Sequence, residues 1–283
     1  MQTLNLPSLQ GGGSLQDVLE SISDPLGNRP EYLVRHDLAG ALIDTVAIFA
    51  GQATLTSGQG SGTGMSIEVM PVPFSPAPAA TASAEGRVAA TSGQYYEFSL
   101  HSSVGGLEHI VRLAEEPPVR TDAHLEAWVR GSARDRESPD DTWVEAALRR
   151  YEEMPMPERL LAWNSLLIAD SGEIWARRFT IPDAETIPWD VFRADGSFLG
   201  QVNFSADLRI QHIDEGRLTV VSSDDLGVER ALTASARRMP SPWARFWPPA
   251  SEVRAAVRGS QGAALFCSFC DREAPRLSAT TSP

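Results

Sequence analysis

The stretch from Leu166 to Val202 reads LLIADSGEIWARRFTIPDAETIPWDVFRADGSFLGQV, with short apolar runs separated by turns that contain Gly172 and Gly196. Alternation of apolar and polar residues over four to eight positions is typical of half-buried strands. Glycine supplies the positive φ that tight hairpin turns need. We therefore expect two consecutive hairpins here, which together form one antiparallel unit of four strands.

The same pattern recurs along the chain. Ser83 to Val111 contains a second pair of hairpins, and single hairpins are expected within Leu33–Ala47 and Ile213–Val221. Units of similar size that recur are the signature of a repeat architecture, and four-stranded antiparallel units are the blades of β-propellers. We predict a mainly β fold, a partial β-propeller of four-stranded antiparallel blades. A β-sandwich or a meander with similar hairpins is the alternative.

Residues 121–161 follow a helical period and interrupt the strands. Thr121-Asp122 is a predicted N-cap, and Ser138-Pro139-Asp140-Asp141 is a second helix start. We expect this helical insertion to be a lid over the central funnel of a propeller or packing on its outer rim. Rim packing is favoured, because no polar side chains suited to catalysis cluster on the helices.

The composition divides the chain into a partial propeller at residues 1–238 and an irregular tail at residues 239–283, which is rich in proline and arginine. The Gly/Ser/Thr-rich stretch from Gly51 to Gly64 is expected to be a flexible loop. Pro71 to Pro78 is expected to be extended and to lie outside any central strand, because proline lacks a backbone donor.

Some of these residues resemble a known family. Leu166–Trp175 is similar to the L-x-x-D-x-x-G-N-x-W strand pair of bacterial six-bladed, NHL-like β-propellers, Trp189–Gly200 resembles the strands that follow it, and Leu226–Arg230 resembles the start of their last strand. The resemblance covers about Pro30 to Arg237. It implies a six-bladed ring, of which we count about three units here. We therefore expect only the C-terminal half of such a propeller, from a truncated gene or completed by a second chain, and an extracytoplasmic setting for full-length relatives.

Cys267 and Cys270 have C-x-x-C spacing, but no second cysteine pair or following histidine completes a zinc site. A redox role requires a βαβ context, which the tail lacks. We therefore assign this pair no function.

The other chemistry-bearing side chains also lack a recognisable motif. None of the five histidines, His36, His101, His109, His124 and His212, is spaced for shared metal ligation. His101 and His109 flank one turn, but two solvated strand histidines are the favoured interpretation. Asp224-Asp225 and Glu115-Glu116 are interpreted as solvated charge rather than as a cation site or an acid/base pair. Trp163, Trp175 and Trp189 are interpreted as packing aromatics.

The sequence thus predicts no catalytic residue, no metal and no cofactor. A net charge of −13 argues against a nucleic-acid partner, and no apolar run has the length of a membrane span. The N-terminus has no secretory signal. We expect a binding or scaffolding module for an unknown protein or small-molecule ligand, with self-association possible through exposed blade edges. A lactonase-like hydrolase or lyase with an incomplete site, and a non-functional fragment, are the less favoured interpretations.

Overall fold

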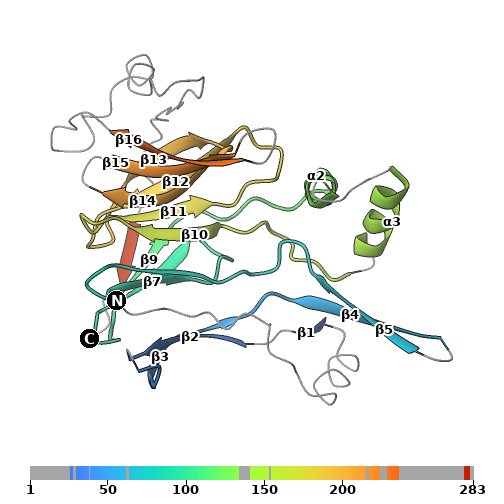
Figure 1. Cartoon of the computed structure of the whole chain (residues 1–283), viewed down its shortest axis with the longest axis horizontal. Coiled ribbons are helices and arrows are strands. Elements are labelled where there is room, and N and C mark those ends of the chain that lie inside the picture. Colours follow the sequence, from blue (N-terminus) through green and yellow to red (C-terminus); the bar gives the residue numbers. More distant parts are fainter. Residues whose placement is uncertain are drawn as a thin grey trace.

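The computed structural model describes residues 26–27, 30–37, 39–61, 64–133, 141–152, 154–214, 217–223, 228–235 and 277–280. These residues form a mainly β fold in which antiparallel sheets are stacked on one another, with two helices to one side (Figure 1).

Four antiparallel sheets make up the stack, and, one C-terminal strand aside, each is built from strands that are consecutive in sequence. The first pairs β2 (Pro30–His36) with β3 (Leu42–Ala50). The second contains β6 (Ala79–Ala82), β7 (Val88–Thr91), β8 (Glu97–His101) and β9 (Leu107–Leu113). The third contains β10 (Trp163–Ile168), β11 (Ile174–Arg178), β12 (Thr186–Phe192) and β13 (Phe198–Ser205). The fourth contains β14 (Leu208–Asp214), β15 (Arg217–Ser223) and β16 (Glu229–Ser235).

The sheets pack face to face, because each buries its apolar side chains against the next. Leu33 of β2 packs with Val88 and Ala90 of β7. Between the second and third sheets, Phe98 and Phe192 form an aromatic core with Trp163. Between the third and fourth sheets, the core includes apolar side chains of both, among them Trp175, Trp189, Phe204, Ile210 and Val220. Trp163, Trp175 and Trp189 are therefore packing residues, as predicted.

Five hairpin turns share one hydrogen-bond pattern. In each, the first residue donates its N–H to the carbonyl of the fifth, and the fourth, a glycine at φ between +84° and +94°, donates to the carbonyl of the first. This is the geometry of a three-residue loop that ends in a left-handed glycine. These turns span residues 37–41, 83–87, 102–106, 169–173 and 193–197. The expected hairpins and the role of their glycines are confirmed at these five positions.

The turns gather at one end of the stack. Within a sheet of consecutive antiparallel strands, the first and third connections lie at the same end. Between sheets, Arg87 donates to the carbonyl of Ala194 at 2.6 Å, and the N–H of Asp170 donates to the carbonyl of Ile213 at 3.0 Å. The first strands of three sheets, β6, β10 and β14, also lie side by side. The described sheets form an open stack, so the closed ring of a propeller is not seen.

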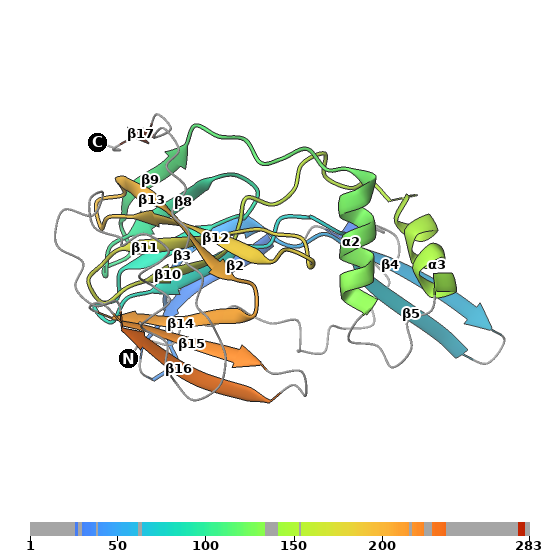
Figure 2. The ribbon, with the colours of Figure 1, turned by 90° about the horizontal axis from the view of Figure 1, so that it is seen from above.

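The expected helical insertion is present as α2 (Asp122–Ala133) and α3 (Asp141–Glu152). Thr121 caps α2, since its hydroxyl accepts the N–H of His124 at 3.3 Å. The second predicted helix start lies mostly outside the described residues, which resume at Asp141. Both helices pack around Phe74 in an apolar cluster of their own, on the side of the molecule away from the hairpin turns (Figure 2).

Two segments differ from expectation. The stretch from Gly51 to Gly64, expected to be a loop, contributes β4 (Thr54–Ser61), which pairs with β5 (Gly64–Pro71) and with β1 (Leu26–Gly27). The loop prediction was wrong because strand pairing uses backbone hydrogen bonds, which polar and glycine-rich sequences also provide. Near the C-terminus, β17 (Leu277–Thr280) adds an unexpected fifth strand beside β9. The rest of the predicted tail, with Cys267 and Cys270, lies outside the described residues.

Candidate ligand-binding cavity

A cavity of about 1000 Å³ lies at the turn end of the stack, where the first strands converge. Its wall combines parts of four sheets: residues of β2 and β3, the β6–β7 and β8–β9 turns, the end of β10, and β14. The charged or titratable lining residues are Arg35, Glu85, Asp170 and His212. The cavity therefore draws its polar groups from loops and strand ends that a rigid stack of sheets holds in place.

Arg35 forms a fixed part of this wall. Its side chain is 7% exposed, and its guanidinium donates to both carboxylate oxygens of Asp44, at 3.1 and 2.5 Å, and to the carbonyl of Ser103. The β8–β9 turn lies so close that a side chain at Gly105 would collide with this guanidinium. Because Asp44 neutralises it, Arg35 ties the β2–β3 hairpin to the second sheet and presents little free charge to the cavity.

Asp170 and His212 form the second polar element of the lining. Nε2 of His212 lies 3.2 Å from Oδ2 of Asp170, and both side chains are about half exposed, at 52% and 50%. Asp170 occupies the β10–β11 turn, and the bond from its N–H to Ile213 holds that turn against β14. The pair thus bridges the third and fourth sheets at the rim.

Glu85 is the third charged group and differs from the other two. It lies exposed in the β6–β7 turn. Among the described residues, no hydrogen bond or ion pair is found for its carboxylate. Together, Glu85 and Asp170 give the cavity an excess of negative charge, since the positive charge of Arg35 is already matched by Asp44.

One histidine differs from the interpretation of His101 and His109 as solvated strand residues. His101 is 6% exposed, not solvated, and lies opposite Val88, on the side of the second sheet that faces β2 and β3. His109 lies opposite Leu100, on the other side, so the two histidines do not share a face. Burial lowers the pKa of His101 below its ordinary value, so its ring is neutral near pH 7. In the described part of the chain, no three His, Cys, Asp or Glu side chains gather in a way that could hold a metal ion.

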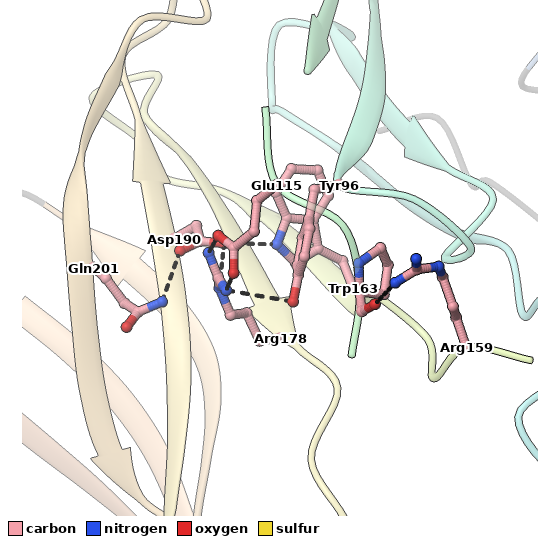
Figure 3. A network of polar contacts seen from close by, with 8 residues as sticks. Tyr96, Glu115, Arg159, Trp163, Arg178, Asp190 and Gln201 are labelled. Atoms are coloured by element: carbon pink, nitrogen blue, oxygen red, sulfur yellow. Dashed lines mark hydrogen bonds and ion pairs between the residues drawn. The ribbon is translucent and has the colours of Figure 1, made fainter. Parts of the chain in front are cut away.

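A second polar cluster lies between the second and third sheets (Figure 3). Asp190, fully buried in β12, accepts hydrogen bonds from Nε1 of Trp163 at 2.8 Å, from Nε of Arg178 at 2.8 Å and from the amide of Gln201 at 3.0 Å. Arg178 also donates to both carboxylate oxygens of Glu115 at 2.8 Å. The guanidinium stands 4.4 Å from the ring centre of Tyr96.

This cluster corrects the interpretation of Glu115-Glu116 as solvated charge at Glu115 only, because the side chain of Glu116 is 77% exposed. Glu115 pairs with Arg178, and Glu116 pairs with Arg159 at 2.5 Å. Burial raises the pKa of Asp190, while the charge of Arg178 opposes that shift. Burial lowers the pKa of Arg178, but its bonds to Glu115 and Asp190 outweigh this and raise the pKa above its usual range.

The cluster is best understood as a clamp between two sheets. Every buried partner is hydrogen-bonded, as interior charges require, and none of these side chains lines the cavity. The adjacent Arg177 and Arg178 are the signal that could have indicated this cluster, because successive side chains of a strand point to opposite faces of the sheet and one guanidinium must enter an interface between sheets.

The remaining predicted residues carry no site that the structure describes. Asp224-Asp225 and Cys267/Cys270 lie outside the described residues. His36 is held by the carbonyl of Gly40 at 3.0 Å from Nδ1, and His124 lies at the N-terminus of α2. Neither described helix is long and apolar enough to cross a membrane.

Comparison with known proteins gives no further guide to the site. No protein-family model matches the chain, and no curated protein is significantly similar to it.

Proposed function

We propose that this chain is an arc of a β-propeller that acts as a binding module, and that its ligand occupies the cavity at the turn end. The arc is supported by consecutive four-stranded sheets that pack face to face with their first strands adjacent. That is the relation between neighbouring blades, whose first strands line the central axis. The observation that carries the binding function is the cavity itself, because its wall is shared by several sheets.

The charges of the lining favour a cationic ligand. Arg35 is matched by Asp44, which leaves Glu85 and Asp170 as the anionic groups that face an occupant. Nε2 of His212 contacts one oxygen of Asp170, Oδ2. A ligand with an ammonium or guanidinium group would gain charge-assisted hydrogen bonds from both carboxylates.

The volume sets the size of the ligand. At about 1000 Å³, the cavity lies at the upper end of the range for small-molecule sites. A polyamine, or an extended peptide that carries a basic side chain, would fill it.

Isothermal titration with spermidine, and with citrate as the anionic probe, tests the proposal. Spermidine should bind the wild-type chain, and Glu85→Gln/Asp170→Asn should weaken that binding about tenfold or more, as the loss of two charge-assisted contacts implies. The matched control is Glu152→Gln/Glu185→Gln, which removes the same charge from exposed positions outside the cavity.

Equal weakening in both double variants would mean that spermidine responds only to the net charge of −13, and the proposal would be wrong. Binding of citrate in preference to spermidine would also overturn it. Heteronuclear NMR shifts should fall on the β6–β7 and β10–β11 turns if the cavity is the site.

A further inference from the structure

The two ends of the stack of sheets differ in polarity. At one end, the outer face of β2–β3 carries the cross-strand pair Tyr32 and Ile48, which are 44% and 62% exposed. Leu42 and Ile43, at 61% and 52%, continue this apolar surface toward the hairpin turn. Isolated exposed apolar residues are ordinary, but several gathered on one sheet face mark an interaction surface.

β14–β16 form the opposite end of the stack (Figure 1), and the outer face of these strands is mainly polar. Its outward positions include Arg209, which pairs with Glu229 at 2.8 Å, and Thr219 opposite Thr233. Most apolar residues of these strands, such as Val220, point inward to the third sheet, while Val221, opposite Arg209, lies on the outward face. This face therefore resembles the polar cap that ends a stacked architecture.

Between the four stacked sheets that the structure describes, apolar faces are covered by the neighbouring sheet, as the cores between them show. The outer face of β2–β3 has the character of such an internal face, yet in the part of the chain that the structure describes no sheet lies on it. We propose that it packs against the same face of a second copy of this chain, so that two stacks join back to back about a twofold axis.

A contact between the β2–β3 faces of two copies is favoured over a head-to-tail contact for two reasons. The outward β14–β16 face sets Val221 beside the ion-paired Arg209 and so offers no continuous apolar counterpart to Tyr32 and Ile48, whereas the β2–β3 face complements itself, as an isologous interface requires. The patch also carries no charge, so the twofold contact brings no like charges together in chains whose net charge is −13.

The size of the patch predicts a weak dimer. β2 and β3 have seven and nine residues. At about 3.3 Å per residue and roughly 4.8 Å between strands, the face measures about 30 by 10 Å. That is below the roughly 800 Å² per partner of a standard interface, so we expect a dissociation constant on the order of 10 μM.

Sedimentation-velocity and light-scattering measurements from about 1 to 300 μM, a range set around that constant, test the proposal. The mass should rise from the monomer value of 30.6 kDa toward twice that value. Ile48→Asp and Ile48→Arg should each stay monomeric, with far-ultraviolet circular dichroism to check that they fold. Thr219→Asp, on the polar face, should associate like the wild type.

An equal mixture of Ile48→Asp and Ile48→Arg chains separates the possible arrangements. If the β2–β3 face packs against the same face of a second chain, the introduced carboxylate and guanidinium attract each other across the twofold axis. The mixture should then dimerise again. A wild-type chain that is monomeric throughout overturns the proposal, and so does a dimer that persists in both Ile48 variants. Loss of the dimer in Thr219→Asp would show that the chains meet head to tail.

Discussion

Replacing Gly196 with alanine tests how the hairpin turns hold the sheets together. Gly196 occupies the fourth position of the 193–197 turn, and Gly40 occupies the same position of the 37–41 turn. Both have φ of +84°. A Cβ atom at Gly40 would meet nothing within 4 Å, whereas one at Gly196 would lie 2.5 Å from Cγ2 of Val111 in β9. The two glycines therefore share a backbone requirement and differ only in their neighbours.

The expected losses of unfolding free energy follow from this difference. A left-handed conformation costs a non-glycine residue about 1 kcal/mol or slightly more, so Gly40→Ala should lose about that much. Gly196→Ala should lose a further 1–3 kcal/mol or so, because the new methyl group overpacks a buried contact between the third and second sheets. Val111→Ala removes the clashing methyl groups, so the double variant should recover roughly 1–3 kcal/mol relative to the sum of the single changes.

Urea unfolding followed by tryptophan fluorescence measures these differences, because Trp163, Trp175 and Trp189 are all buried between sheets. The m-values should stay constant across the series, so that shifts in midpoint report stability. Equal losses in Gly40→Ala and Gly196→Ala, or a double variant without recovery, would refute the contact between the 193–197 turn and β9.

Two further variants test the buried polar groups. Arg178→Met should lose about 3–5 kcal/mol of unfolding free energy, because it leaves the buried Asp190 without its cation. Arg177→Met, next to it on β11, should lose much less, because burial already disfavours the charge of Arg177 and lowers its pKa. Similar losses in both variants would contradict the clamp. Burial lowers the pKa of His101 below 6.5, so the folded state binds fewer protons there than the unfolded state and loses stability as pH falls below that value. His101→Asn should therefore flatten the decline in urea midpoint between pH 7 and pH 5, and an unchanged decline would show that other groups cause it.

The hairpins were predictable from sequence because their chemistry is local. Turns such as Ala169–Glu173 place a glycine where positive φ is needed, and apolar alternation marks the strands on both sides. The helical insertion was predictable for the same reason, since Thr121 and the apolar spacing that follows it are local signals. The mainly β class and the two four-stranded units followed from these signals alone.

Contacts between sheets were not predictable in this way. Nothing near Glu115 in sequence indicates Arg178, which lies 63 positions away, and the burial of His101 depends on its lying on the side covered by β2–β3. β4 was missed because its pairing requires no apolar alternation. The cavity was missed because its lining residues come from sheets whose relative placement only the packing determines.

The turn geometry also explains why polar groups collect at the cavity without a cost to folding. The backbone bonds of each turn use the first, fourth and fifth residues, and only the fourth must be glycine. The second and third positions are free of this constraint. Asp170 occupies the second position of its turn and Glu85 the third, and both face the cavity. Substitution there should change which ligand binds while leaving the stack of sheets intact, as is typical of loops on a rigid scaffold. Under the proposed binding function, Asp170 and Glu85 should therefore determine which ligand binds, whereas the strand residues are required for packing.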